Sequence, residues 1–163
     1  MEVLSVKLVH VKYDNKNIID RVFNSLQHLS NEYTDFEQWF FCKVIPGLKD
    51  GSRKIYAVVD AQAIAGVLIL KDSGEKKICT LRVSEAYRNQ GIGTKLLKQA
   101  FKELKTAKPI ITVSSLHLHE FMHLLSKHGF IMKKEYPGYY KTGISVFCFN
   151  GFLNETLQYE ECV

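Results

Sequence analysis

Apolar residues recur along this chain with two different periods, and each period predicts a different kind of element. Alternation of apolar and polar residues, as in residues 3–11, is typical of a β-strand. Apolar residues three and four positions apart, as in residues 17–29, predict a helix with one buried face. Strands are expected at residues 3–11, 55–60, 63–70, 77–83, 110–113, 130–135 and 145–149, and helices at residues 17–29, 34–45, 92–104 and 116–128.

Local signals mark where several of these elements begin and end. The run Thr-Asp-Phe-Glu at residues 34–37 is a capping-box pattern that opens the second helix. Pro46 and Gly47 are expected to stop that helix. Gly129 is expected in the left-handed conformation that follows the end of the last helix. The tyrosine-rich residues 136–140 are expected to form the loop between the last two strands.

The expected elements follow the order β, α, α, β, β, β, α, β, α, β, β. Short spacers between the strands of residues 55–83 favour an antiparallel meander. The order as a whole predicts an α/β fold, a mixed sheet with helices on its faces. The chain of 163 residues is long enough for one such domain, assigned to residues 1–150, and residues 151–163 are assigned to a C-terminal tail.

The composition is that of an ordinary globular protein, with 46% hydrophobic and 24% charged residues, which argues against disorder. No apolar run approaches the roughly 18 residues of a membrane span, and residues 1–7 lack the features of a secretory signal, so a cytoplasmic protein without a membrane partner is expected. The net charge of +5 is compatible with an anionic ligand but is too weak to indicate nucleic-acid binding. The four cysteines lack the paired spacing of a zinc site or a disulfide framework; they are Cys42, Cys79, Cys148 and Cys162.

The most informative segment is the expected junction between a strand and a helix near residues 83–94. Gly91 and Gly93 let the main chain turn with its amides pointing inward and approach a ligand with no Cβ in the way. These amides, together with the free donors and the positive dipole of the helix start, form an anion site, and Arg88 adds a charged donor at its rim. A pyrophosphate group is the natural occupant, and an ordinary tight turn is the alternative.

Two other phosphate-binding motifs do not fit this segment. A dinucleotide-binding GxGxxG motif needs glycine or alanine at position 96, where this chain has Leu96. A P-loop needs the pattern GxxxxGK[ST], which Gly91 and Gly93 do not supply. The pattern that remains is R-x-x-G-x-G after a strand that reads Leu-Arg-Val.

Residues 81–93, Leu-Arg-Val-Ser-Glu-Ala-Tyr-Arg-Asn-Gln-Gly-Ile-Gly, resemble the pyrophosphate-loop motif of the GNAT superfamily of acyl-CoA-dependent N-acyltransferases, in which proline is common where Glu85 stands. Residues 128–130, His-Gly-Phe, resemble the helix-to-strand junction of that family, and the order of elements agrees over residues 3–150. The resemblance implies a GNAT-like α/β fold, a mixed and mostly antiparallel sheet flanked by helices. It also implies a splayed central strand pair that admits the thioester.

The resemblance further implies which residues hold acetyl-CoA, the expected cosubstrate. Main-chain groups of the strand pair with the pantetheine arm, and the loop with the first helical turn holds the pyrophosphate. The implied cofactor-binding residues are Leu81, Arg82, Val83, Arg88, Asn89, Gln90, Gly91, Ile92, Gly93 and Thr94. The basic face of the following helix, from Lys95 to Lys105, is expected to be solvated, although one lysine could reach a terminal phosphate.

Acetyl transfer to an amine requires removal of a proton from the acceptor and benefits from a donor for the departing thiolate. Family members often place a tyrosine as this donor four residues before the junction glycine, but Leu125 stands there in this chain. The candidate catalytic residues are therefore Tyr140 and Tyr139, with Tyr136 in the same segment; packing of a groove or of the core is the alternative role for these tyrosines. Glu85 or an ordered water is the candidate relay for the acceptor's proton, and simple exposure is the alternative for Glu85.

Two aromatic segments bear on the acceptor. The tyrosine-rich residues 136–140 resemble a segment of GNAT enzymes that acetylate peptide N-termini, but the acidic stretch that often follows it there is absent. A second group, with the core as its alternative location, could line an acceptor pocket and consists of Phe36, Trp39, Phe40 and Phe41.

Residues 119–123, His-Glu-Phe-Met-His, match the HExxH motif of zinc metallopeptidases. On a helical wheel both histidines lie nearly opposite the buried face, which is expected to contain Leu118, Phe121, Met122 and Leu125. No obvious third ligand follows within a short distance, so no metal is expected.

The favoured function is transfer of an acetyl group from acetyl-CoA to a primary amine of a small molecule, a peptide or a protein, directly within a ternary complex. The alternatives are a non-catalytic acyl-CoA-binding module and an HExxH zinc metallopeptidase. Aminoacyl-tRNA is kept as one acceptor of the transferase, and a homodimer is left open.

Overall fold

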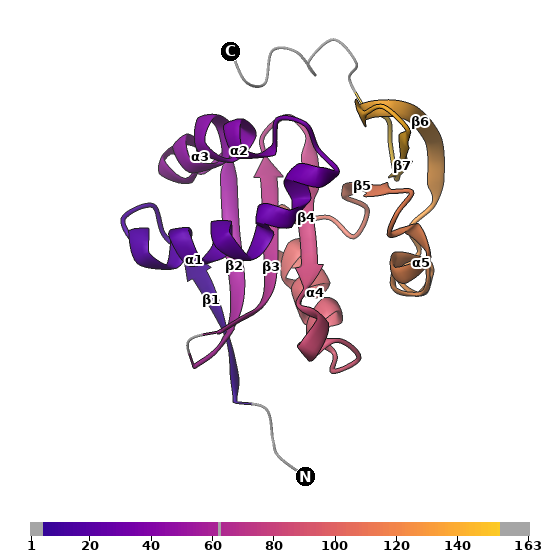
Figure 1. Ribbon diagram of the computed structural model, residues 1–163. Coiled ribbons are helices and arrows are strands. Elements are labelled where there is room, and N and C mark those ends of the chain that lie inside the picture. The colour runs from indigo at the N-terminus through magenta and orange to yellow at the C-terminus, as the bar shows by residue number, and fades with distance from the viewer. Residues whose placement is uncertain (1–4, 62, 154–163) are drawn as a thin grey trace.

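The computed structural model of the chain describes residues 5–61 and 63–153 (Figure 1). The strands are β1 (Val6–Val11), β2 (Arg53–Asp60), β3 (Ala63–Asp72), β4 (Lys76–Val83), β5 (Ile110–Ser114), β6 (Met132–Lys141) and β7 (Ile144–Phe149). The α-helices are α1 (Lys16–Leu26), α2 (Phe36–Trp39), α3 (Ile45–Asp50), α4 (Ile92–Leu104) and α5 (Leu118–Lys127). Shorter turns are the 3-10 helices η1 (Gln27–Asn31) and η3 (Glu85–Tyr87) and the π-helix η2 (Phe40–Val44). No helix in the described ranges is long and apolar enough to cross a membrane.

The seven described strands form one sheet in the order β1-β2-β3-β4-β5-β7-β6. Neighbouring strands are antiparallel, except β4 and β5, which are parallel. The predicted fold class, a mixed and mostly antiparallel sheet flanked by helices, is therefore confirmed. In Figure 1, the part that contains β5, β6, β7 and α5 turns away from β1–β4.

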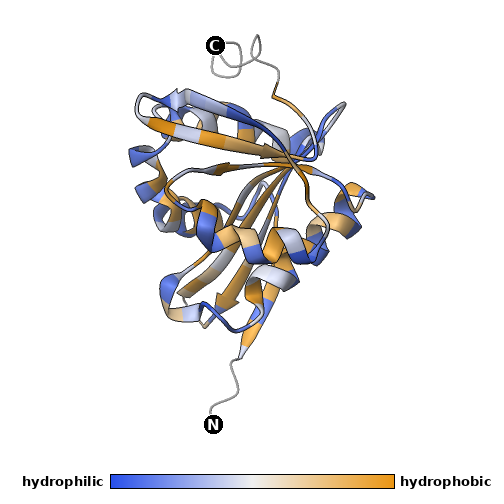
Figure 2. Ribbon diagram, turned by 90° about the vertical axis from the view of Figure 1, so that its right-hand side faces the viewer, coloured by the Kyte–Doolittle hydropathy of each residue, from blue (hydrophilic) through white to orange (hydrophobic). Residues whose placement is uncertain are grey.

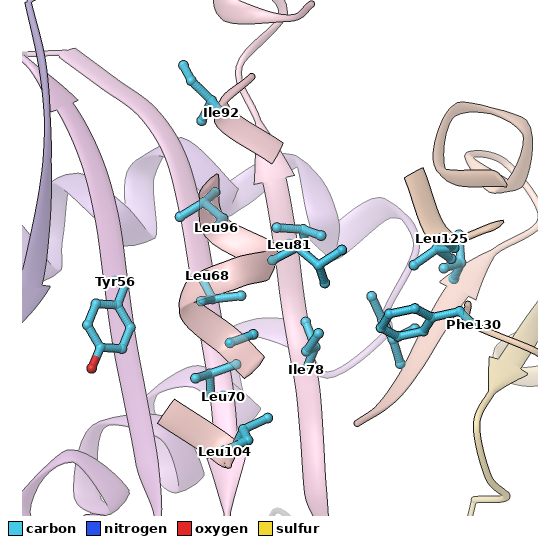
Figure 3. Close-up of a cluster of buried hydrophobic side chains, with 14 of the residues drawn as sticks. Tyr56, Leu68, Leu70, Ile78, Leu81, Ile92, Leu96, Leu104, Leu125 and Phe130 are labelled. Atoms are coloured by element: carbon cyan, nitrogen blue, oxygen red, sulfur yellow. The ribbon is translucent and has the colours of Figure 1, made fainter. Parts of the chain in front are cut away.

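Apolar side chains cover both faces of the sheet, and the strands between the helices are largely orange in Figure 2. On one face α1, α2 and η2 pack over β2 and β3, where Phe40 and Ile55 are fully buried. On the other face α4 packs over β3 and β4, where Leu68 and Leu96 belong to one buried cluster (Figure 3). Because burial of one such side chain contributes about 1.5–3 kcal/mol, the sheet is held firmly between two apolar layers.

The second helix differs from its prediction, because it does not stop at Pro46 and Gly47. It passes from α2 through η2 into α3 and ends before Gly51, whose φ is 85°. A proline inside an α-helix removes an amide donor, and its ring clashes with the carbonyl four residues earlier. Pro46 is the second residue of α3 and follows the π-helical turn after Ile45; in that turn, bonds reach five residues back and the carbonyls are spread apart. The wider turn thus accommodates the proline, and the helix continues.

The expected capping box at residues 34–37 does not form. Asp35 precedes α2, and no side-chain hydrogen bond caps this helix. The hydroxyl of Thr34 donates instead to the carbonyl oxygen of Tyr140, at 2.8 Å. This hydrogen bond joins the segment before α2 to β6.

The tyrosine-rich residues 136–140 lie within β6, so the prediction of a loop there is wrong. β6 pairs with β7 on both sides of a register shift between Pro137 and Lys141, and the turn lies at residues 142–143. Pro137 and Gly138 misled the prediction because both are typical turn residues. β6 is an edge strand, where a missing amide donor is tolerated, and Gly138 adopts a φ of 65° beside a register shift.

The chain ends are only partly covered by the structure. Residues 3 and 4 of the predicted first strand and residues 154–163 of the predicted tail lie outside the described residues. Gly129 follows α5 with a φ of 76°, which confirms the left-handed conformation predicted for it.

Candidate active site

The strands β4 and β5 pair with each other over a short distance only. Their register joins Lys77 to Ile110 and Ile78 to Ile111, and beyond these pairs β5 continues beside β7. On the β5 side, β4 therefore carries main-chain N–H and C=O groups after Ile78 that no strand of the described sheet pairs. The predicted splay of a central strand pair is confirmed, and it opens the edge of β4 at residues 81–83.

The loop between β4 and α4 makes the turns that its sequence predicts. Asn89 and Gly91 have φ angles of 62° and 81°, and Gly91 is the residue that precedes α4. The amide of Lys95 donates to the carbonyl oxygen of Gly91 in the first turn of the helix. The amides of residues 92–94 therefore have no partner within the helix, and they lie at its positive end. This is an anion-binding geometry.

The residues expected to hold acetyl-CoA gather at this end of β4 and α4, but their side chains differ in what they offer. Leu81 and Ile92 are only 4% and 3% exposed, so they offer a ligand their main chain alone. Arg88 is exposed, and its Nη1 atom lies 3.8 Å from Oε1 of Glu120 on α5. Asn89, Gln90 and Gly91 are exposed as well. The side chain of Arg82 points to the other face of the sheet.

A cavity of about 340 Å³ lies on that other face, beside α2. Both splayed strands line it, β4 with Arg82 among others and β5 with Val113 and Ser114. The segment from Leu29 to Trp39 and the end of β6 supply further walls. α4 covers the opposite face of the sheet, and the loop at residues 88–94 leads into it. The gap between β4 and β5 therefore lies between this cavity on one side and that loop on the other.

The two tyrosines predicted as catalytic, Tyr139 and Tyr140, both line this cavity. Their ring centres are 4.7 Å apart, and the ring of Tyr33 lies 5.0 Å from that of Tyr140. Burial raises the pKa of Tyr33 to about 12, so at neutral pH it can donate a proton but cannot act as a base. Tyr136 is buried, and its hydroxyl accepts a hydrogen bond from the amide of Leu153.

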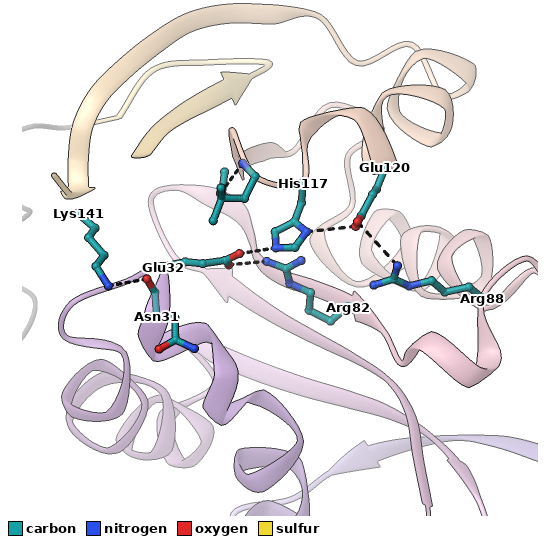
Figure 4. A network of polar contacts seen from close by, with 9 residues as sticks. Asn31, Glu32, Arg82, Arg88, His117, Glu120 and Lys141 are labelled. Carbon is teal, nitrogen blue, oxygen red and sulfur yellow. Dashed lines mark hydrogen bonds and ion pairs between the residues drawn. The ribbon is translucent and has the colours of Figure 1, made fainter. Parts of the chain in front are cut away.

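A chain of polar and charged side chains crosses from the cavity wall to the loop (Figure 4). The carboxylate of Glu32, which is 6% exposed, contacts Arg82 at 3.0 Å and also contacts Nε2 of His117. Nδ1 of His117 lies 3.2 Å from Oε2 of Glu120, the partner of Arg88. Sequence analysis missed Glu32 and His117 because each lies in an irregular segment and only the fold brings them together.

Residues 51–132 match the family model described as the acetyltransferase (GNAT) domain. The match spans half of the chain and contains the splayed pair, the glycine-containing loop and α4. This chain belongs to the GNAT acetyltransferase family. The resemblance stated from residues 81–93 and 128–130 is therefore confirmed.

Solved GNAT structures share this fold at low sequence identity. The GNAT acetyltransferase from Streptococcus pneumoniae is 16% identical, with a TM-score of 0.66 over 89% of this chain and 97% of that one. Arabidopsis thaliana NAA60, solved with a bisubstrate analogue, is 16% identical, with a TM-score of 0.65 over 92% of this chain and 100% of that one. A Bacillus subtilis acetyltransferase in complex with CoA is 15% identical, with a TM-score of 0.59 over 91% of this chain and 100% of that one. A search of curated protein sequences gave no match.

In this GNAT domain the position of the usual thiolate donor is occupied by a core residue. Leu125 is fully buried in the apolar layer beneath α4 and α5. Glu85, the candidate relay, is exposed in η3 and does not line the cavity. Neither Leu125 nor Glu85 therefore supplies an acid or a base beside the gap between β4 and β5.

The aromatic candidates of this GNAT domain divide between the cavity and other locations. Trp39 lines the cavity, as the acceptor-pocket hypothesis expects, and Phe36 fits both expectations because it lines the cavity and is a core residue at 4% exposed. Phe40 is a core residue, as the alternative expects, and Phe41 is exposed.

The HExxH residues of this GNAT domain are exposed on α5, as the helical wheel predicts for His119 and His123. Glu120 faces Arg88 and His117. Met122 is exposed, so its prediction as a buried residue is wrong; α5 buries a narrower stripe centred on Leu125. Within residues 5–61 and 63–153, no group of three or more His, Cys, Asp or Glu side chains is placed to hold a metal ion.

Proposed function

We propose that this protein transfers the acetyl group of acetyl-CoA to the amine of an acceptor within a ternary complex. The observation that carries the proposal is the splay of β4 and β5, with an anion-binding loop on one side and a cavity on the other. A thioester that enters from the loop side presents its carbonyl carbon to an amine in the cavity. Transfer is then direct, and no side chain of the protein has to carry the acetyl group.

Acetyl-CoA suits the open edge of β4 and the start of α4. The amide-rich pantetheine arm can pair with the main chain of residues 81–83 in place of the absent strand. The free amides of residues 92–94 and the exposed Arg88 suit the pyrophosphate. The contact between Arg88 and Glu120 is an exposed ion pair of low energy, which a bound pyrophosphate can replace. The Bacillus subtilis neighbour was solved with CoA, which supports this part of the proposal.

The reaction consists of one acyl transfer, in which an N–C bond forms and the C–S bond breaks, and two proton transfers. A neutral amine attacks the thioester carbonyl, the C–S bond breaks, the nitrogen loses a proton and the thiolate gains one. Tyr139 and Tyr140 are the candidate donors to the thiolate because both line the cavity. A main-chain amide of the open β4 edge is the candidate donor to the oxyanion. Since Glu85 lies outside the cavity, water is favoured over Glu85 as the relay for the acceptor's proton.

The pyrophosphate site is tested by a carboxylate at Thr94, the third residue of α4. A negative charge in the first turn stabilises a helix but repels a pyrophosphate bound there. In calorimetric titration with coenzyme A, we expect Thr94→Glu to raise Kd by at least about 10-fold, or about 1.4 kcal/mol. Ser126→Glu, which adds the same charge at an exposed position of α5, is the control and should bind like the unmodified protein. If both variants bind equally well, the loop does not hold the pyrophosphate.

A non-catalytic acyl-CoA-binding module is the second candidate, and the buried Leu125 favours it. Both functions share the cofactor site, so coenzyme binding does not separate them. Release of free thiol from acetyl-CoA across a panel of amines, peptides and charged tRNA does separate them. Turnover of any acceptor supports the transferase, whereas binding without turnover of the whole panel favours the module. The cytoplasmic location, the homodimer and the domain boundary at residue 150 stay predictions.

A further inference from the structure

Arg53, the first residue of β2, is a buried cation in the wall of the cavity. The residue is 7% exposed. Its Nη1 atom donates to Sγ of Cys79 at 3.4 Å, and its guanidinium carbon lies 5.8 Å from the centre of the Trp39 ring. Among the described residues no carboxylate forms an ion pair with it. The guanidinium therefore has an aromatic face and a thiol as neighbours, but no anion.

The guanidinium of Arg53 has N–H groups that are available to bind a ligand. It carries five N–H donors, while a thiol is a weak acceptor. Burial of a cation without an anionic partner is unfavourable. In the described part of the chain no fully buried side-chain nitrogen lacks a hydrogen-bond partner, so the nitrogens of Arg53 that make no bond retain access to solvent. Because Arg53 lines the cavity, that access leads into it.

The other charged residues of the cavity do not neutralise Arg53. Glu75 pairs with Lys71 at 3.4 Å, and Asp35 is exposed at the start of α2. Arg82, the other arginine of the wall, already has Glu32 as its partner. The positive charge of Arg53 thus remains available to an anion that enters the cavity.

Helix α3 fixes the stem of Arg53 in place. A Cβ at Gly47 would lie 2.3 Å from Cγ and 2.7 Å from Cβ of Arg53, so the stem of Arg53 passes through space that only glycine leaves open. The Trp39 ring lies on the guanidinium end. A guanidinium held in this way loses little side-chain entropy when it binds an anion.

The position of Arg53 along the cavity sets the length of a ligand that reaches the splay. The guanidinium contacts Cys79, and the open edge of β4 comprises residues 81–83. A strand rises about 3.3 Å per residue, so the two to four residues from Cys79 to this edge correspond to roughly 7–13 Å. The amine and the carboxylate carbon of an α-amino acid are only about 2.5 Å apart, which is too short for this span.

We infer that the acceptor is an amine that also carries an anionic oxygen group, a carboxylate or a phosphate, and that Arg53 binds this group. The separation between amine and anion is about 7–13 Å. The inference rests on the proposed acetyl transfer and specifies its substrate class. The planar guanidinium fork suits either group, because both offer a pair of oxygens for two parallel hydrogen bonds.

Matched acceptors test the inference with the unmodified protein and acetyl-CoA. Aminohexanoate and aminooctanoate span the required distance, and their carboxamides are neutral copies of the same length. The ratio of kcat/KM between each acid and its carboxamide is expected to be about 10 to 100, the worth of a charge-assisted hydrogen-bond pair. Glycine and its amide should give no such preference. The aminoalkylphosphonate of equal length shows whether phosphate or carboxylate is preferred.

Variants of Arg53 connect the preference to this side chain. In Arg53→Gln the ratio between acid and carboxamide should fall to about one, and in Arg53→Lys it should be intermediate. Lys49→Gln removes a positive charge from the exposed face of α3, outside the cavity, and should keep the ratio of the unmodified protein. An equal ratio in Arg53→Gln and the unmodified protein would overturn the inference.

A binding measurement that needs no turnover completes the test. Trp39 is the chain's single tryptophan and lies beside Arg53, so its fluorescence reports anion binding directly. Titration with hexanoate should change the emission, and hexanamide should not. A fluorescence response without acetylation of any amine would support the anion site and contradict the proposed function. Acetylation of acids and carboxamides at equal rates would overturn this inference and leave the proposed function standing.

Discussion

At the scale of single residues, the tyrosines around the cavity differ in what their hydroxyl groups can do. Tyr136 uses its hydroxyl to accept the amide of Leu153 within the core. Tyr33 keeps its proton because burial raises its pKa to about 12. Tyr139 and Tyr140 line the cavity from β6, the strand that sequence analysis took for a loop. The catalytic role of Tyr139 and Tyr140 stays a prediction, and the loop predicted for them is wrong.

Replacement of these tyrosines by phenylalanine separates the proton donor from the wall residues. If Tyr139 or Tyr140 protonates the thiolate, its phenylalanine variant is expected to lower kcat by at least about 10-fold with a smaller change in KM. Tyr13→Phe is the matched control, because it removes a hydroxyl from a tyrosine that does not line the cavity. Steady-state kinetics with a saturating amine measures all variants. Full activity in both Tyr139→Phe and Tyr140→Phe would leave the tyrosines with a packing role only.

Lys54 on β2 joins two carboxylates, one of them on α4, and makes stability depend on pH. It contacts Asp72 and Glu103, each at 3.0 Å. The hydrogen bond from Lys54 lowers the pKa of Glu103, and hydrogen bonds from Lys76 and Lys54 lower the pKa of Asp72. Since the folded pKa values lie below the unfolded ones, these groups stabilise the fold above about pH 4, and that contribution is lost as the pH falls through the lowered pKa values.

Lys54→Met is therefore expected to destabilise the protein by about 1 kcal/mol at neutral pH and by less in acid. The measurement is the difference in Tm between the variant and the unmodified protein at about pH 7 and about pH 3. Lys98→Met, at an exposed position of α4, is the control and should show a small difference at both values. If the Tm difference between Lys54→Met and the unmodified protein is as large in acid as at neutral pH, the contacts of Lys54 with Asp72 and Glu103 do not cause the pH dependence of stability.

At the scale of elements, the segment from α2 to α3 shows why a local stop signal can fail. Pro46 and Gly47 predict the end of a helix from their own chemistry, and that prediction ignores the turn before them. The π-helical η2 accommodates Pro46, and Gly47 is retained in the helix beside the stem of Arg53. The reason for the glycine is thus a tertiary contact, which no sequence pattern of the segment reports.

Gly47→Ala is expected to lower stability, although glycine to alanine inside a helix is usually favourable by about 1 kcal/mol. The added Cβ meets the stem of Arg53 rather than the end of a flexible side chain. An overpacked contact of this kind typically costs about 1–3 kcal/mol, measurable by chemical denaturation. At Gly93 in α4 the nearest atom to an added Cβ is Cδ2 of Leu124 at 3.5 Å, an ordinary contact, so Gly93→Ala should not be destabilising. Comparison of the two variants shows whether the space around the added Cβ or the helix propensity of alanine determines the change in stability.

Two hydrogen bonds hold β6 against the segment before α2, and both close one wall of the cavity. Thr34 donates to the carbonyl oxygen of Tyr140 at 2.8 Å, and Lys141 donates to the carbonyl oxygen of Asn31 at 2.7 Å. Each bond is worth about 0.5–1.5 kcal/mol. The double variant Thr34→Val, Lys141→Met is expected to raise KM for the acceptor about 3- to 10-fold and to leave the Kd of coenzyme A unchanged. An equal loss of both affinities would mean that this wall also supports the cofactor site.

At the scale of the whole molecule, the fold was predictable and the cavity was not. The order of elements follows from periodicity, and the anion-binding loop is a local motif whose glycines and helix start lie within a few residues. The cavity joins Tyr33, Arg53 and Tyr140 from segments far apart in the sequence. Neighbouring residues carry no signal of such distant contacts, so the pairing of Glu32 with His117 was likewise missed.

Binding of acetyl-CoA across the splay is expected to stabilise the entire protein. A ligand that binds only the folded state adds about 2.7 kcal/mol at a concentration 100 times its Kd. The Tm should therefore rise by several degrees with acetyl-CoA in the unmodified protein and in Ser126→Glu. Thr94→Glu should show no such rise at the same concentration, although its own Tm without ligand is not lowered. A rise of equal size in Thr94→Glu would place the coenzyme elsewhere.

Only two residue pairs join β4 to β5, so the sheet has two parts, β1–β4 and β5–β7, which share a short line of contact. Few main-chain bonds cross this line, and the buried apolar cluster beneath α4 and α5 supplies the rest of the attachment between the two parts. We expect a donor nucleotide that binds in the splay to contact both parts and so to fasten them together. The gap that the proposed cosubstrate enters is thus also the place where its binding is expected to make the sheet more rigid.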